Sequence, residues 1–245
     1  MLPLTGVLCA ICGERIFSSY AVADLGGDPR CGLCRRVEPA FARAAAYGSY
    51  EGGLRELIHL LKYNGIRPAA NVLGRMLAET IAELAPEFSL DSVAVIPVPL
   101  YRAKLREREF NHAELIACAA VKLFPQPGRL KLCAGTLQRK RETPSQTGLT
   151  RHQRRENVRG AFAVAHPEAV KDREVLVVDD VFTTGATVSE CARVLRRAGA
   201  AKVWVATVAR TLKLSEQKIE RQFSENDTAE EDTVLEIPLA RAAGS

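Results

Sequence analysis

Two adjacent aspartates, Asp179 and Asp180, follow a run of apolar residues at 175–178 and precede a loop of small, mostly hydroxyl-bearing residues. Neighbouring carboxylates repel each other, so the pair favours a partner with hydroxyl donors, such as a ribose diol, or a bridging cation such as Mg²⁺. The loop is made of Thr183, Thr184, Gly185, Ala186 and Thr187. It opens an expected helix, and helix N-termini bind anions through their free N–H groups and positive dipole. The spacing of diol-binding acids and phosphate-binding amides suits a ribose 5-phosphate.

A plainer interpretation of the same residues is a strand, a turn and a helix whose threonines only cap the helix. Thr187 and Glu190 stand at the spacing of a capping box, which fits this interpretation as well. The loop lacks the Gly-Lys-Ser/Thr ending of a Walker A loop, and it is not the G-x-G-x-x-G of a dinucleotide-binding fold. The common nucleotide-binding motifs are therefore excluded.

Four cysteines near the N-terminus follow the pattern C-x2-C-x18-C-x2-C, at Cys9, Cys12, Cys31 and Cys34. This spacing is typical of tetrahedral four-thiolate zinc sites, and four thiolates leave no open position for a substrate, so the expected role is structural. Gly13 and Gly32, each beside a cysteine, are expected to permit tight turns. A redox-active C-x-x-C is the alternative, which two copies at this spacing make less favourable.

The composition is that of an ordinary globular protein, with 245 residues, 47% of them hydrophobic, and a net charge of +5. No apolar run approaches the roughly 20 residues of a membrane span, and no signal peptide is evident, so a cytoplasmic location is expected. Residues 129–160 hold nine Lys/Arg against two Glu, which suits an anionic partner or a solvated surface loop. Residues 212–236 hold eight acids against three bases, which predicts a largely disordered acidic tail.

Hydrophobic periodicity predicts helices over 47–62 and after Pro68, and an amphipathic helix after a basic turn within 101–124. Buried strands are expected at 92–100, near 132–137, near 160–164, at 174–178 and at 202–209. Strands that alternate with helices predict an α/β fold with a parallel sheet, whose ligands lie at the carboxyl ends of the strands. This rule predicts that the acid pair faces residues 97–102 across a cleft.

Several motifs, taken in order, resemble the ComF/GntX-like branch of the type I phosphoribosyltransferase superfamily. VLVVDDVFTTGAT resembles the superfamily's signature for 5-phosphoribosyl 1-pyrophosphate (PRPP), and the likeness extends over roughly residues 9–210. The chain departs at Arg108-Glu109-Phe110-Asn111-His112, where the family often has R-G-F-N-Q. Beyond the cysteines and IPVPL, the matching positions are Tyr47, Tyr50, Gly52, Lys62, Tyr63, Gly65, Phe110, Asn111, Arg139, Arg141, Thr143, Gln146, Leu149, Arg154, Asn157, Gly160, Ala161 and Phe162.

The resemblance implies a type I phosphoribosyltransferase-like parallel sheet flanked by helices, preceded by a small zinc ribbon. It implies that Asp179 and Asp180 bind the ribose hydroxyls and that Thr183–Thr187 wrap the 5-phosphate. Arg102 and Lys104 would meet the pyrophosphate, with Mg²⁺ held mainly by ligand oxygens, and Arg102, Lys104 and Arg141 are the catalytic candidates. The segment 139–155 would close over the site. The four histidines, His59, His112, His152 and His166, are expected to be incidental.

Two functions remain open at this point. One is a protein that binds PRPP with Mg²⁺ and handles transforming single-stranded DNA together with DNA-uptake machinery, through Arg139, Arg141, Arg151, Arg154 and Arg155. The other is an active phosphoribosyltransferase in nucleotide or cofactor salvage, with an acceptor that no segment identifies. The expected organisation is a zinc ribbon at 1–45, a phosphoribosyltransferase-like domain at 46–211 and the acidic tail at 212–245.

Overall fold

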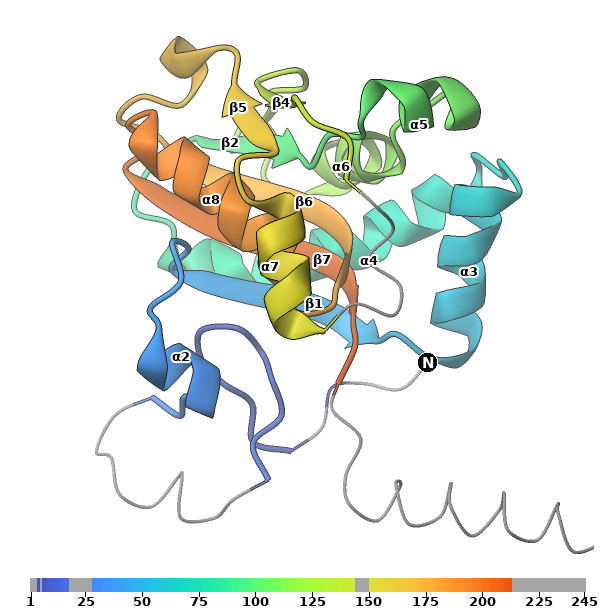
Figure 1. Ribbon diagram of the computed structural model, residues 1–245. Coiled ribbons are helices and arrows are strands. Elements are labelled where there is room, and N and C mark those ends of the chain that lie inside the picture. The colour runs from blue at the N-terminus through green and yellow to red at the C-terminus, as the bar shows by residue number, and fades with distance from the viewer. Residues whose placement is uncertain (1–3, 5, 18–27, 144–149, 213–245) are drawn as a thin grey trace, which may run out of the picture. The chain divides into compact units, whose positions relative to one another are not determined.

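The computed structural model describes residues 4, 6–17, 28–143 and 150–212, which belong to one compact unit (Figure 1). The acidic tail expected at 212–245 lies outside these residues except for Leu212. Within the described part of the chain, no helix is long and apolar enough to cross a membrane.

A five-stranded parallel sheet forms the centre of the unit, with strand order β1-β7-β6-β2-β3. The strands are β1 (Arg43–Ser49), β2 (Val93–Pro97), β3 (Leu130–Leu132), β6 (Glu174–Phe182) and β7 (Lys202–Arg210). A separate antiparallel pair consists of β4 (Leu137–Arg139) and β5 (Phe162–Val164). The parallel sheet and its flanking helices agree with the predicted fold class.

Helices cover both faces of the sheet (Figure 1). One face packs against α3 (Gly52–Tyr63), α4 (Ala69–Leu84) and α6 (His112–Leu123), and the other packs against α8 (Ala186–Arg197). The remaining helices are α2 (Gly32–Arg36), α5 (Arg102–Arg108), α7 (Arg151–Val158) and the 3₁₀ turns η1 (Ala85–Glu87) and η2 (Pro167–Ala169).

The central strands are apolar on both sides because both sides are covered. In β6, Leu176 and Val178 join the core under α4 and α6, whereas Val175 and Val177 join the core under α8. All four side chains are fully buried. This burial on both faces fixes the position of β6 along its axis. It therefore also fixes where the acid pair lies at the carboxyl end of the sheet.

Three element predictions need correction. The sequence did not predict β1, because its RAAAYGS stretch has few β-branched residues, and the helix expected from residue 47 begins at Gly52. The strand expected near 132–137 is two short strands, β3 and β4, separated by a turn. The expected amphipathic helix is α6, but the basic segment before it, predicted as a turn, forms a short helix of its own, α5.

The N-terminal segment that carries Cys9, Cys12, Cys31 and Cys34, called the cysteine module below, packs against the sheet. It covers the outer edge of β1. The amide of Ala44 donates to the carbonyl of Ile11 over 2.7 Å, which pairs a group that an edge strand would otherwise leave open. Gly13 adopts φ +67°, as its expected role in a tight turn requires. Gly32 instead begins α2 and has no positive φ, so it is not needed for a turn.

Candidate functional site

A cavity of about 420 Å³ lies where β6 ends and the segments after β2 and β6 diverge. Its lining includes both aspartates, Thr183 and Thr187 of the loop, and Val98, Pro99 and Leu100 after β2. The cleft predicted between the acid pair and residues 97–102 is therefore present. Five cationic side chains also line it: Lys62, Lys104, Arg108, Arg139 and Arg154.

Asp179 and Asp180 lie within β6, which continues to Phe182, rather than just after the strand as predicted. Asp180 is 4% exposed. Backbone amides hold both side chains in place: Asp180 donates its N–H to Asp179 Oδ1 over 2.9 Å, and Val181 donates to Asp180 Oδ1 over 2.7 Å. The two carboxylates are thus fixed by their own strand.

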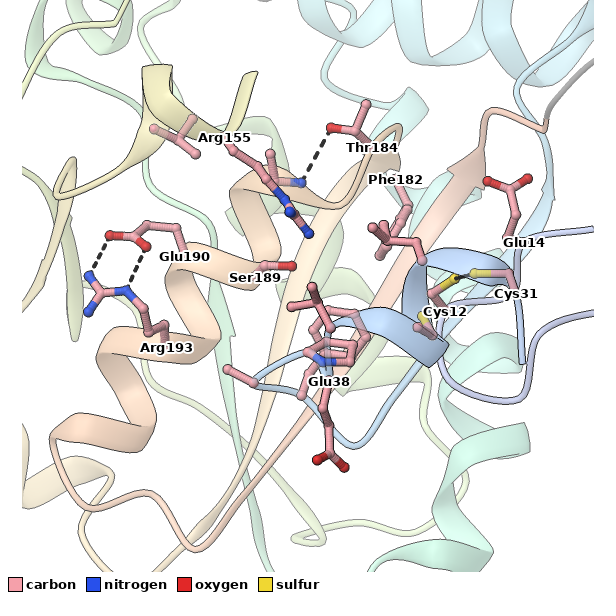
Figure 2. Close-up of a pocket in the computed structure, with 18 of the residues that line it drawn as sticks. Cys12, Glu14, Cys31, Glu38, Arg155, Phe182, Thr184, Ser189, Glu190 and Arg193 are labelled. Carbon is pink, nitrogen blue, oxygen red and sulfur yellow. Dashed lines mark hydrogen bonds and ion pairs between the residues drawn. The ribbon is translucent and has the colours of Figure 1, made fainter. Parts of the chain in front are cut away.

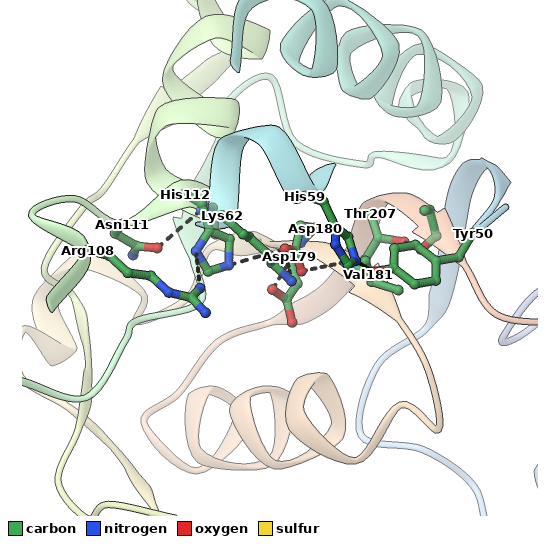
Figure 3. A network of polar contacts seen from close by, with 12 residues as sticks. Tyr50, His59, Lys62, Arg108, Asn111, His112, Asp179, Asp180, Val181 and Thr207 are labelled. Atoms are coloured by element: carbon green, nitrogen blue, oxygen red, sulfur yellow. Dashed lines mark hydrogen bonds and ion pairs between the residues drawn. The ribbon is translucent and has the colours of Figure 1, made fainter. Parts of the chain in front are cut away.

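The other oxygen of Asp180 is held from two helices (Figure 3). Lys62, at the end of α3, forms an ion pair with Asp180 Oδ2, and His112, the first residue of α6, places Nε2 3.3 Å from the same atom. Arg108 Nη1 lies 3.5 Å from His112 Nδ1 on the far side of the ring. Lys62 thus places a positive charge directly beside the acid pair.

The two aspartates have opposite pKa shifts. Burial, and then the charge of Asp180, raises the pKa of Asp179 to about 7. Burial would raise the pKa of Asp180 too, but Lys62 and then His112 outweigh it and lower that pKa to about 2. Burial also lowers the pKa of His112 to about 4, so its ring is neutral at pH 7 and adds no positive charge beside Asp180. The pair therefore carries close to one negative charge at about pH 6 and below, and between one and two at pH 7.

The expectation that all four histidines are incidental is wrong for His112. Asn111 positions it: the Asn111 side chain accepts from the N–H of Ala113 and donates to the carbonyl of Val98 over 3.1 Å, which ties the start of α6 to the loop after β2. His59 instead bonds to the hydroxyl of Tyr50 over 3.0 Å, and His166 lies beside Glu168. Exposed His152 is not among the residues that line this cavity.

Sequence reasoning also assigned no role to Lys62, although Lys62 and Asn111 both stood among the family-like motifs. Those motifs were the sequence feature that could have indicated a role for Lys62 and Asn111 in the site. No spacing along the chain links residue 62 to residue 180. The departure at position 109 has a structural cost: Glu109 adopts φ +63°, a conformation that suits the glycine often found there in the family. His112 stands where the family often has glutamine.

The hydroxyl-rich loop forms the N-terminus of α8, as predicted. Gly185 is the N-cap residue and adopts φ +76°, and the N–H of Ala186 donates to Thr184 Oγ1 over 3.4 Å. The capping box expected between Thr187 and Glu190 is wrong. Glu190 accepts from the N–H of Gly160 over 2.7 Å and from Arg193, because both groups reach it on the outer side of α8. A capping box exists at α7 instead, between Thr150 and Gln153.

The loop residues divide between two cavities. Thr183 and Thr187 line the acid-pair cavity, whereas Thr184 and Ala186 line a second cavity of about 430 Å³ on the other side of the loop (Figure 2). Of the five loop residues, Thr183 and Thr187 are thus the ones that line the same cavity as the acid pair.

The basic residues divide as well. Arg139 and Arg154 reach into the acid-pair cavity, where Arg154 Nη1 donates to Thr183 Oγ1 over 3.3 Å. Arg141 turns away and donates to the carbonyls of Asn157 and Arg159 over 2.9 and 3.0 Å. Arg155 lines the second cavity (Figure 2), and the side chain of Arg151 lies outside the described parts.

The pyrophosphate candidates after β2 also separate. Lys104 lines the acid-pair cavity, whereas Arg102, the exposed first residue of α5, is not among the residues that line it. Of the three catalytic candidates, the structure thus brings Lys104 to the acid pair. It places neither Arg102 nor Arg141 in that cavity.

The four cysteines come together as their spacing predicts. Their sulfur atoms all lie within 4.8 Å of one another, and Cys12 Sγ lies 3.7 Å from Cys31 Sγ (Figure 2). A disulfide requires about 2.05 Å, whereas the edge of a thiolate tetrahedron around zinc, with Zn–S near 2.3 Å, measures about 3.8 Å. The arrangement therefore fits a tetrahedral metal ion.

Comparisons with known proteins agree with this fold. The family model described as "Phosphoribosyl transferase domain" matches residues 130–234. The chain is 31% identical over 216 residues to "DNA utilization protein YhgH" of Escherichia coli O157:H7, covering 84% of this chain and 91% of that protein. It is 29% identical over 210 residues to "Competence protein F" of Haemophilus influenzae, covering 83% and 90%. The chain belongs to the ComF/GntX-like family of type I phosphoribosyltransferase-like proteins.

Among solved structures, the chain is similar to a phosphoribosyltransferase from Corynebacterium diphtheriae. The likeness has 20% identity and a TM-score of 0.34, over 65% of this chain and 90% of that chain. A TM-score this low carries no argument about the site.

Replacing Asp179 by Asn should stabilise the protein in a pH-dependent way. Between about pH 4 and pH 7 the folded state keeps a proton on Asp179 that the unfolded chain has lost, so the wild type loses stability as pH rises through this window. Asn keeps the oxygen that accepts from Asp180 N–H but does not ionise. We expect D179N to raise the free energy of unfolding by about 1 kcal/mol or more at pH 8.

Urea unfolding at several pH values measures this difference. The gain should grow from pH 4 to pH 7 and stay constant above. The exposed Asp91 supplies the control, D91N, which should show no such trend. A gain that does not vary with pH would mean that Asp179 ionises normally.

Proposed function

We propose that the protein binds PRPP together with Mg²⁺ in the acid-pair cavity. The observation that carries the proposal is that two fixed carboxylates, two loop threonines and several cations line one cavity of about 420 Å³. Asp179 and Asp180 accept from the ribose hydroxyls, and the N-terminus of α8 with Arg154 binds the 5-phosphate. Lys104 and Arg139 lie in the same cavity and neutralise the pyrophosphate.

Mg²⁺ enters this site with the ligand. Lys62 already neutralises Asp180, so the pair lacks the excess charge that would hold a divalent ion on its own. The oxygens of PRPP supply the missing ligands for the metal, and the metal then favours the ionised form of Asp179. Binding of PRPP with Mg²⁺ therefore releases a proton near neutral pH.

The cellular role that we propose is the handling of single-stranded DNA during DNA uptake. Two relatives carry the names "DNA utilization protein" and "Competence protein F", and these names support the assignment. Arg139 and Arg154 reach into the acid-pair cavity. We therefore propose that they bind the anionic groups of PRPP rather than DNA. Arg155, which is exposed on α7, and its neighbour Arg151 one turn earlier remain for DNA.

We also propose that the cysteine module holds one structural zinc ion through Cys9, Cys12, Cys31 and Cys34. The ribbon at 1–45, the domain at 46–211 and the tail at 212–245 remain our proposed division. Because β1 begins at Arg43, the sheet starts slightly before the proposed boundary.

Replacing both aspartates by asparagine (D179N/D180N) should abolish PRPP binding, because neutral amides are weaker acceptors for the ribose hydroxyls and cannot balance the charge of Mg²⁺. Isothermal titration with PRPP and Mg²⁺ measures it, and the control is D91N, the same change outside the cavity. Unaltered affinity in the double variant would contradict the assignment, as would the absence of heat with the folded wild type. Release of pyrophosphate in the presence of a panel of bases would favour the transferase over the binding protein.

Reversing two charges on α7 (R151E/R155E) should weaken binding to single-stranded DNA. Each lost phosphate contact lowers affinity and flattens the salt dependence, and we expect about a tenfold loss at low salt. Arg141 is left unchanged because it supports the backbone of α7. Fluorescence anisotropy measures binding, with R75E/K122E as the control for an equal charge change on the helices of the other face. Equal losses in both variants would indicate non-specific attraction.

The purified protein should contain about one zinc ion per chain, because four thiolates complete one tetrahedral site. Replacing Cys31 by serine should lower the zinc content measured by mass spectrometry. Serine at Cys118, which stands outside the cluster, should leave it unchanged. Full zinc retention in C31S would remove Cys31 from the site.

A further inference from the structure

Arg210, at the end of β7, is a buried arginine that contacts the cysteine module. It is 3% exposed. Its guanidinium donates to the carbonyl of Cys12 and to Glu14 Oε2 over 3.2 Å, and Nη2 lies 3.9 Å from Cys12 Sγ. Its Nε has no hydrogen-bond partner among the described residues. The position of this side chain therefore depends on Cys12, one of the candidate metal ligands.

The other side of the same guanidinium contacts Phe182, the last residue of β6. The Cζ atom of Arg210 lies 4.3 Å from the centroid of the Phe182 ring, a cation–π distance, and Phe182 is 4% exposed. The ring also packs directly against the loop of residues 183–187. A Cβ atom on Gly185 would lie 2.6 Å from Phe182 Cζ. A shift of the Phe182 ring toward the loop would therefore press on the backbone of Gly185, and a shift away from the loop would remove this support.

Gly185 is the N-cap of α8 and sets the direction of the helix's first N–H groups, which are the proposed phosphate ligands. The second cavity lies on the opposite side of this loop from the acid pair. Cys12, Cys31, Phe182 and Thr184 all line it (Figure 2), so the cysteine module and the back of the loop face one common space. Arg210 and Phe182 connect the cysteine module with the loop across this space.

We propose that metal occupancy of the cysteine module and ligand occupancy of the phosphate loop are coupled through Arg210 and Phe182. The proposal rests on the ribose-phosphate site proposed above. With the metal bound, Cys12 is fixed, and its carbonyl and sulfur hold the guanidinium against the Phe182 ring. When Cys12 moves, a buried charge loses part of its partners and must rearrange, which changes the support beneath Gly185. Arg210 and Phe182 are thus positioning residues for the loop.

Thermodynamic reciprocity gives a test that does not depend on turnover. If zinc strengthens the binding of ribose 5-phosphate, then ribose 5-phosphate must strengthen the binding of zinc by the same factor. The full chain, loaded with zinc, is equilibrated with a chromogenic chelator with and without saturating ribose 5-phosphate. We expect the ligand to tighten zinc binding about fivefold or more in the wild type.

Two variants probe the connection: R210K keeps the charge but loses the two-pronged contact, and F182L keeps an apolar side chain but loses the ring. Both should bind zinc and ribose 5-phosphate yet show less coupling. E38Q, at an exposed residue that lines the same cavity, should couple like the wild type.

Calorimetric titration of the same samples with ribose 5-phosphate separates the possible failures. A wild type that binds the sugar phosphate but shows unchanged zinc affinity would overturn the coupling alone. Full coupling in both R210K and F182L would also overturn it, because the connection would then lie elsewhere. A folded wild type that does not bind ribose 5-phosphate would overturn the proposed function together with the coupling.

Discussion

Two carboxylates cannot both remain charged, side by side and mostly buried, without a compensating cation, and this constraint organises the ligand end of the fold. Lys62 supplies the cation by approaching one oxygen of Asp180, the neutral ring of His112 lies beside the same oxygen, and Asp179 keeps its proton up to about pH 7. The result is an acid pair of intermediate charge. Such a pair accepts hydroxyl groups and accommodates a metal that arrives with its ligand.

The architecture brings these partners together from distant parts of the chain. The acid pair lies near the end of β6, the middle strand of the sheet, α3 carries Lys62, and Asn111 fixes the start of α6 so that His112 reaches Asp180. The loop of residues 183–187 lies next along the chain, with the acid-pair cavity on one side and the cavity shared with the cysteine module on the other. The site therefore depends on the packing of both faces of the sheet at once.

The local features of the site could be predicted from the sequence because they lie within short stretches. The acids, the loop before α8 and the cysteine pairs each occupy a few consecutive residues, and each has a recognisable physical logic. Lys62 and His112 were missed because their roles arise only when two helices are packed on the sheet. The weak strand β1 was missed for a similar reason, since pairing with β7 and burial, rather than its alanines, stabilise it.

The proposed ligand site depends most directly on the unequal ionisation of Asp179 and Asp180. Carbon-13 NMR of the aspartate carboxyl groups, followed from pH 3 to pH 9 and assigned with D179N, measures this property. We expect the pair to titrate in two widely separated steps, one near pH 7 that moves to lower pH with PRPP and Mg²⁺, and one close to pH 2 that lies largely below the range. Two carboxyl groups that both titrate near pH 4, with or without ligand, would contradict the account.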